Sequence, residues 1–260
     1  MWVLLDERNG PEFDVAGAGS RAYVIASSPR SGSTLLGRML GETGLVGEAK
    51  EWLAPMQIRD WELRLSAEAW GRWRHWPLLG PAQGLAGRGI WDRRRVASYL
   101  GRIREHRTGP SGVFGMKLHA EQHRRWFLGY RQSVEDVLGD VRWVWLRRED
   151  RVAQAVSWLR ARQTGRFAAH QRGWGWERYD RRAIARLVQR LEEGEAHWEE
   201  VLRDRNALVV RYEEMVADPV AAVRAVLRHV GVGGEDVVVE VPMRPQADAT
   251  SAEWVRRFRG

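Results

Sequence analysis

The sequence predicts an α/β protein in which a parallel sheet is flanked by helices. Short apolar runs with β-branched and aromatic residues alternate with segments of helical character, the order expected when helices cover both faces of such a sheet. The first of these runs is followed by a turn rich in serine and glycine and then by an apolar helix. A chain of 260 residues can bury a full core, so we expect one domain over residues 1–260.

The first strand is expected over residues 21–27, an apolar run that ends in small polar residues. Residues 28–34, Ser-Pro-Arg-Ser-Gly-Ser-Thr, form the turn, and residues 35–40 begin a helix that ends near residues 41–44. This order is typical of a phosphate-binding unit, because the backbone amides of the turn and the positive end of the helix both attract an anion. The sheet is therefore expected to be P-loop-like.

Three further strands are expected over residues 113–118, 141–146 and 207–211. A helix over about residues 151–163 follows the third strand, and a helix over residues 219–230 follows the fourth. Parallel strands are joined by such helical crossovers. Their carboxyl ends then meet at one edge of the sheet, where ligands bind in this class of fold.

The region between the first two strands, about residues 52–108, is rich in tryptophan and arginine and is expected to be mostly helical and to bind the acceptor. Trp70 and Trp73 have the spacing of a packed helix face. Trp52, next to Glu51, is the tryptophan expected to contact a substrate. The tail, residues 247–260, is expected to contain one short helix.

The charge balance of 42 basic and 34 acidic residues gives a net charge of +8, which would suit a polyanion. The basic residues alternate with acidic ones, and no helix-turn-helix, RNP or zinc pattern is present. We therefore expect no nucleic-acid partner. The alternative from a different functional class is a nucleic-acid-binding protein that uses the loop to bind phosphates. Without cysteine or an HExxH spacing, no disulfide and no metal are expected.

The first ten residues contain only a short apolar run, Val3 to Leu5. A signal peptide or a membrane span needs a longer one. We expect a soluble cytoplasmic protein without a membrane span.

The turn at residues 28–34 has the composition of an anion site. Gly32 allows the backbone to approach an anion closely, and Ser33 and Thr34 can each donate a hydroxyl. Arg30 adds a permanent, forked positive charge. An NTPase loop would instead need a Gly-Lys pair and an acidic residue after a neighbouring strand, where this chain has Arg147. These residues predict a metal-free anion site.

The run from Ser28 to Leu36 resembles the 5′-phosphosulfate loop of the bacterial trehalose 2-sulfotransferase-like family. The resemblance continues in order along the chain, through runs that cover both ends and most strands. These runs are residues 47–52, 115–118, 148–157 with 160–164, 246–248 and 253–259. The resemblance implies the sulfotransferase architecture and 3′-phosphoadenosine 5′-phosphosulfate (PAPS) as cofactor. It also implies a small-molecule acceptor with a hydroxyl group. In the first interpretation this acceptor contains a sugar, and in the second it is a lipid or a secondary metabolite. A homodimer is also possible in this family.

By this similarity, Arg30 and the loop residues would hold the 5′-phosphosulfate, and Arg148 and Ser157 the 3′-phosphate. Near the C-terminus the family has Arg-Gln-Ala-Asp, whereas here Pro245 separates Arg244 from Gln246. Arg244 and Gln246 are therefore expected at the nucleotide, with the contact of Arg244 open. The loop residues with this expected role are Ser31, Gly32, Ser33 and Thr34.

Glu51 matches the carboxylate that acts as general base in the trehalose-type enzymes, and Glu48 matches one that contacts the sugar. On a helical turn both would lie on one face. A carboxylate can serve as the base if burial raises its pKa and a sugar hydroxyl is held in line. Pro29 completes the expected acceptor contacts. Lys117 and His119 offer a rival, because Lys-x-His resembles the eukaryotic cytosolic sulfotransferases, in which the histidine is the base. Both side chains would point to the same side of a strand.

Overall fold

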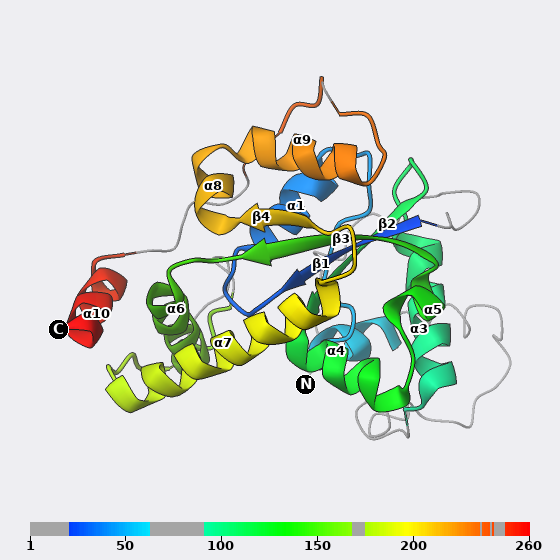
Figure 1. The fold of residues 1–260 in the computed structure, drawn as a ribbon. Helices are drawn as coiled ribbons and strands as arrows, with labels where there is room; N and C mark the ends of the chain where they lie inside the picture. Colours follow the sequence, from blue (N-terminus) through cyan, green and yellow to red (C-terminus); the bar gives the residue numbers. More distant parts are fainter. Residues whose placement is uncertain (1–20, 63–90, 168–174, 235, 240, 242–247) are drawn as a thin grey trace, which may run out of the picture.

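The computed structural model describes residues 21–62, 91–167, 175–234, 236–239, 241 and 248–260. Within these residues the chain forms one four-stranded sheet with the strand order β2-β1-β3-β4. All three strand pairs are parallel. The expected parallel α/β sheet is thus present, and Figure 1 shows its strands ending at the same edge. The strands are β1 (Arg21–Ser27), β2 (Val113–His119), β3 (Asp140–Arg147) and β4 (Leu208–Arg211).

Helices cover both faces of this sheet (Figure 1). On one face, Tyr23 and Ile25 of β1 pack with α1 and α9, and on the other, Ala22 and Val24 pack with α3, α4 and α5. Alternate residues of the same strand are buried on both sides, which explains its continuous apolar run. The helices are α1 (Ser33–Glu42), α3 (Arg93–Arg107), α4 (Ala120–Trp126), α5 (Val134–Leu138), α6 (Arg151–Thr164), α7 (Arg181–Leu202), α8 (Tyr212–Ala217), α9 (Pro219–His229) and α10 (Ala249–Arg259), with a 3₁₀ turn, η2, at Leu128–Tyr130.

Aspartate side chains mark the start of five of the described helices. Each lies at the N-cap and accepts a hydrogen bond from the backbone N–H three residues later. Such a cap stabilises a helix by about 1 kcal/mol, because it satisfies an amide that has no partner within the helix. These caps are Asp92, Asp150, Asp180, Asp218 and Asp248.

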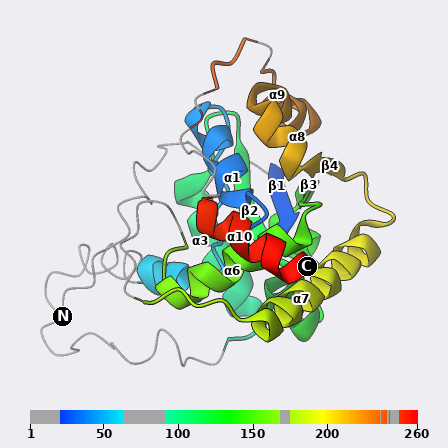
Figure 2. The ribbon, with the colours of Figure 1, turned by 90° about the vertical axis from the view of Figure 1, so that its left-hand side faces the viewer.

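A third cluster of apolar side chains joins α6, α7 and α10 beyond the carboxyl ends of the strands. Ala155 and Leu159 of α6 pack there with Ile184 and Leu187 of α7 and with Trp254 of α10. Figure 2 views the molecule from this side and shows α10 lying next to α6. The expected C-terminal helix is therefore present and buries its tryptophan. Among the described residues, no helix is both long enough and apolar enough to span a membrane.

The described parts of the region expected to bind the acceptor are helical at residues 55–62 and in α3. Their apolar side chains, among them Ile58, Trp61 and Leu100, belong to the core on the α3 side of the sheet. Trp70, Trp73 and Trp76 lie outside the described residues. The two tryptophans of β3, Trp143 and Trp145, are buried in the same core.

Candidate functional site

The loop between β1 and α1 bends through two left-handed residues. Arg30 has φ 64° and Gly32 has φ 92°. A Cβ on Gly32 would lie 2.5 Å from Cδ2 of Tyr212, so no larger residue fits there. Helix α1 begins directly after Gly32, and the first N–H groups of a helix have no carbonyl partner within it. The loop therefore offers backbone donors at a helix N-terminus, as an anion site requires.

Residues after β3 lie against this loop. The Nε of Arg30 donates a 3.0 Å hydrogen bond to Oγ of Ser157, and Nη1 of Arg148 donates a 3.1 Å bond to the backbone oxygen of Arg30. The structure thus brings together the two groups expected to bind the two ends of one nucleotide. Burial, together with the positive charge of Arg148, lowers the pKa of Arg30. Two arginines held this close gain from an anion that both can contact.

Buried polar atoms without a partner lie in the same place. Oγ of Ser31 and Nε of Arg148 are enclosed and have no hydrogen-bond partner within the part of the chain that the structure describes. An unsatisfied buried donor costs about 1–3 kcal/mol. A phosphate or sulfate oxygen would satisfy both donors, so the residues present fit an anionic ligand.

Two side chains that were not predicted from the sequence as site residues also support this arrangement. The ring of Tyr212, the first residue of α8, lies under the guanidinium of Arg148, with 4.5 Å between the Cζ of Arg148 and the ring centroid. The buried Gln154 donates a 2.8 Å hydrogen bond from Nε2 to the backbone oxygen of Pro29. Gln154 lies within the run 148–157 that carries the family resemblance, and Tyr212 directly follows a strand end, so both positions were open to inspection.

Lys117 connects the loop to the carboxylate of Glu51. Its Nζ donates a 2.8 Å hydrogen bond to Oγ1 of Thr34 and lies 3.0 Å from Oε1 of Glu51. The parallel pairing places Lys117 opposite Ile25 and His119 opposite Ser27. Both side chains therefore lie beside the start of the loop, at the carboxyl ends of their strands.

Glu48 and Glu51 do not share a helix face. Lys50 forms a parallel bridge with Met116, so this segment is extended beside β2 rather than helical. Extended residues alternate in direction, and residues three apart then point to opposite sides. The carboxylate of Glu48 lies 3.3 Å from Nζ of Lys50 and 3.9 Å from Nη2 of Arg107, away from the partners of Glu51. The expectation that the two acids act on one face is wrong.

The condition for Glu51 to act as a base, a pKa raised by burial, is not met. Burial alone would raise it, but His119 and Lys117 and the hydrogen bonds from Lys117 and Gln122 lower the pKa to about 2. Oε2 of Glu51 accepts a 3.3 Å bond from Nε2 of Gln122 and lies 3.6 Å from Nδ1 of His119. Glu51 is thus an anion surrounded by donors.

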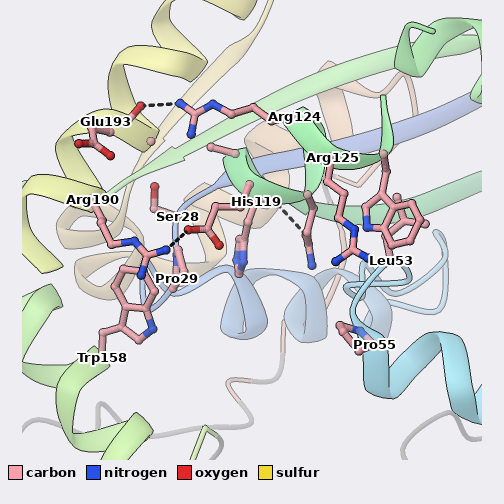
Figure 3. Close-up of a pocket in the computed structure, with 15 residues that line it drawn as sticks. Ser28, Pro29, Leu53, Pro55, His119, Arg124, Arg125, Trp158, Arg190 and Glu193 are labelled. Atoms are coloured by element: carbon pink, nitrogen blue, oxygen red, sulfur yellow. Dashed lines mark hydrogen bonds and ion pairs between the residues drawn. The ribbon is translucent and has the colours of Figure 1, made fainter. Parts of the chain in front are cut away.

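His119 lies at a cavity of about 270 Å³ next to the loop (Figure 3). Burial lowers the pKa of His119, although the neighbouring Glu51 opposes the shift. Its Nε2 has no hydrogen-bond partner among the described residues. The other residues that line the cavity come from the loop, the 53–55 turn, α4, α6 and α7: Ser28, Pro29, Leu53, Pro55, Ala120, Glu121, Gln122, Arg124, Arg125, Trp126, Trp158, Arg190, Glu193 and Gly194.

Trp52 does not face this cavity. Its ring is fully buried, it packs against Trp61 and Phe114, and its Nε1 donates a 2.7 Å hydrogen bond to the backbone oxygen of Gly115. A ring enclosed on both faces cannot stack on a sugar, so the expected substrate contact of Trp52 is wrong. Arg244, Pro245 and Gln246, expected near the nucleotide, lie outside the described residues.

Comparison with known proteins assigns the chain to a family. Residues 22–260 match the family model described as Stf0 sulphotransferase. Trehalose 2-sulfotransferase of Mycobacterium tuberculosis (strain Erdman) is 28% identical over 92% of this chain and 94% of its own length. Trehalose 2-sulfotransferase of Mycolicibacterium smegmatis is 30% identical, also over 92% of this chain and 94% of its own length.

Solved structures of sulfotransferases are also similar. A sulfotransferase from Alicyclobacillus acidocaldarius has a TM-score of 0.48 and 17% identity over 94% of this chain and 95% of its own. The sulfotransferase domain of the Synechococcus PCC 7002 olefin synthase has a TM-score of 0.43 and 21% identity over 96% and 99%. The assignment itself depends on the sequence matches, and by these the chain belongs to the Stf0 sulphotransferase family and is a sulfotransferase.

Proposed function

We propose that this sulfotransferase moves the sulfuryl group of PAPS to a hydroxyl of a carbohydrate acceptor. The observation that carries the proposal is the contact between the two anion-binding groups, the 3.0 Å hydrogen bond from Arg30 to Ser157. PAPS has an anionic group on each side of its ribose, the 5′-phosphosulfate and the 3′-phosphate. A protein that binds it needs two cationic groups close together, as Arg30 and Arg148 are.

The residues present fit this cofactor. Arg30, the first amides of α1 and the hydroxyls of Ser31, Ser33 and Thr34 would hold the 5′-phosphosulfate. Arg148 and Ser157 would hold the 3′-phosphate. The buried Oγ of Ser31 and Nε of Arg148, which lack partners among the described residues, would each gain an acceptor.

Lys117 would stabilise the leaving group. When bound, PAPS supplies the sulfuryl group, and negative charge develops on the 5′-phosphate as the group departs. The ammonium of Lys117 is already held at the loop by Thr34, at 2.8 Å, so it needs little rearrangement to meet that charge. Charge fixed before the reaction is the most effective kind of electrostatic stabilisation in an enzyme.

The Glu51–His119 pair would accept the hydroxyl proton. Of the two side chains, His119 is the one that lines the cavity. Its Nε2 has no hydrogen-bond partner among the described residues. Glu51, whose Oε2 lies 3.6 Å from Nδ1, would balance the positive charge when His119 takes up the proton. With a pKa of about 2, Glu51 is a weak base in this arrangement, so we give the proton to His119, the reverse of the order expected from the sequence.

The cavity beside His119 is where the acceptor would bind. Both curated relatives are named for trehalose, which supports a sugar hydroxyl as acceptor. Family membership also favours an enzyme over the nucleic-acid-binding alternative. The homodimer and the cytoplasmic location expected from the sequence stay predictions.

Thermal unfolding with 3′,5′-adenosine bisphosphate, the product nucleotide, tests cofactor binding. A ligand at 100 times its Kd stabilises a fold by about 2.7 kcal/mol. We expect a clear rise in Tm with this nucleotide and a much smaller one with AMP, which lacks the 3′-phosphate.

Transfer of label from PAPS to trehalose and to a panel of other disaccharides and glycosides tests the reaction. In the thermal-unfolding experiment, equal stabilisation by the bisphosphate and by AMP would contradict the two-anion site. Labelling of a non-sugar hydroxyl alone would move the acceptor to another class.

A further inference from the structure

The wall of the acceptor cavity carries more positive than negative charge. This inference rests on the proposed function, because it concerns the acceptor of the same site. The lining contains three arginines, Arg124, Arg125 and Arg190, and two glutamates, Glu121 and Glu193. A neutral sugar needs no such surplus, and the contacts of each arginine show which charge is available to a ligand.

Arg190 is paired with a carboxylate, whereas Arg124 is held by a backbone oxygen that does not neutralise its charge. Nη2 of Arg190 donates a 2.8 Å hydrogen bond to Oε1 of Glu121, which joins α7 to α4 across the cavity. Nη2 of Arg124 donates a 3.0 Å bond to the backbone oxygen of Glu193. Figure 3 shows both contacts on the Glu193 side of His119.

Arg125 has no carboxylate partner in the part of the chain that the structure describes. Its guanidinium is exposed and lies over the ring of Trp126, with 4.6 Å between its Cζ and the ring centroid. The ring holds the cation in place without neutralising it. Figure 3 shows Arg125 on the side of His119 away from Arg190, near Leu53 and Pro55.

Arg125 and the proposed proton acceptor, His119, line the same cavity. Gln122, which bonds to Glu51, and Arg125 lie three residues apart on α4 and so share one helix face. Arg125 therefore lies about one helical turn along α4 from the residue that contacts Glu51, and it lines the same cavity as His119.

We infer that the acceptor is an anionic sugar whose carboxylate or phosphate ester is bound by Arg125, beside the hydroxyl that becomes sulfated. The apolar surface of Leu53 and Pro55 would contact the ring of this sugar. Trp158, with Arg190 6.0 Å above its ring, would bound the opposite end of the cavity.

Matched acceptors that differ only in charge test the inference. With labelled PAPS, kcat/KM is measured for methyl glucuronide and methyl galacturonide against their uronamides, which keep the same hydroxyls. Trehalose 6-phosphate against trehalose distinguishes a phosphate ester from a carboxylate. We expect the charged member of at least one pair to be preferred about tenfold or more, because a charge-assisted contact to arginine is about twice as strong as a neutral hydrogen bond.

Variants then assign the preference to Arg125. Arg125→Gln should remove it through a higher KM at unchanged kcat, and Arg125→Glu should invert it. Arg94→Gln removes an exposed arginine of α3 and should keep the preference. Each variant should keep the Tm rise with 3′,5′-adenosine bisphosphate, which shows that the fold and the nucleotide site are intact.

A charged-to-neutral ratio near one in the unmodified enzyme would overturn the inference, and so would an unchanged ratio in Arg125→Gln. If the bisphosphate stabilises the fold and only neutral acceptors are sulfated, anion recognition fails while the proposed function stands. If the bisphosphate does not stabilise the fold and no acceptor is labelled, the proposed function fails, and this inference fails with it.

Discussion

The side chain of Ser157 on α6 accepts a 3.0 Å hydrogen bond from Nε of Arg30 in the loop after β1. These residues are far apart in the sequence and meet because β1 and β3 are adjacent parallel strands that end at the same edge. A cation and a hydroxyl held in contact can bind one anion together. The contact joins the loop expected to hold one end of PAPS to the residues expected to hold the other.

Replacement of Ser157 by alanine should weaken binding of 3′,5′-adenosine bisphosphate more than binding of AMP. A hydrogen bond to a charged group contributes about 1.5–3 kcal/mol, which corresponds to roughly a tenfold or larger rise in Kd. Calorimetric titration with both nucleotides measures the difference, and Ser111→Ala, which alters an exposed serine bonded to Leu45, is the matched control. An equal loss for both nucleotides would place Ser157 away from the 3′-phosphate.

Tyr212 should be needed for nucleotide binding through its ring and not through its hydroxyl. The ring lies 4.5 Å under Arg148 and against Gly32, so it positions both groups. Because a cation–aromatic contact contributes about 0.5–2 kcal/mol, Tyr212→Leu should raise the Kd for the bisphosphate by roughly tenfold. Tyr212→Phe keeps the ring and should bind like the unmodified enzyme. Unchanged binding by Tyr212→Leu would show that Arg148 holds its position without the ring.

His119→Gln should reduce kcat while nucleotide binding stays intact. A general base typically contributes about 10²–10⁴-fold to the rate, so we expect a loss of at least about 100-fold. Initial rates with labelled PAPS measure the loss, and the Tm rise with bisphosphate checks the fold. If His119→Gln keeps its turnover and Glu51→Gln loses it, Glu51 is the base, as the family resemblance implies.

Glu51→Gln should move the pH dependence of the rate. The carboxylate of Glu51 raises the pKa of His119 against the larger effect of burial, so its removal lowers that pKa further. His119 acts as a base only when it is neutral, so the acid limb of the kcat profile should shift to lower pH, at a reduced maximum rate. A limb that does not move would show that another group titrates there.

The sheet was predictable because its strands are buried on both faces. Continuous apolar runs located all four strands to within one residue at each end, for example 141–146 against the observed Asp140–Arg147. No bounds were predicted for helix α7, although its buried residues Ile184, Leu187 and Leu191 follow the helical period. The helix contains many charged residues, such as Arg190 and Glu193, and these make the apolar period hard to recognise in the sequence.

The parts of the site that were not predicted depend on contacts between distant segments. The position of Glu48 is set by the bridge from Lys50 to Met116, which no local pattern encodes. The burial of Trp52 follows from its packing on Phe114 and its bond to Gly115. By contrast, Arg30, Arg148 and Ser157 lie in runs that resemble a known family and at strand ends that a parallel sheet must bring together.

Acidification should destabilise the fold through two buried histidines behind the cavity wall. His123 on α4 and His197 on α7 are buried, and their ring nitrogens are 3.0 Å apart. Burial, with His197 and Arg205 nearby, lowers the pKa of His123 to about 4, and burial with Arg124 lowers that of His197 to about 4. In the unfolded chain a histidine titrates near about 6.5, so between these values the unfolded state binds more protons.

The free energy of unfolding should therefore fall as the pH drops from above 6.5 toward 4, and it should be constant near pH 8. Urea unfolding at several pH values measures the slope. Because the glutamine of His197→Gln does not titrate, this variant should show a smaller slope over that window. His106→Gln, on α3 where the ring packs against Trp61, is the control for the loss of a histidine outside this pair. An equal slope in His197→Gln would mean that other groups take up the protons, and the pair would then have no part in the acid sensitivity.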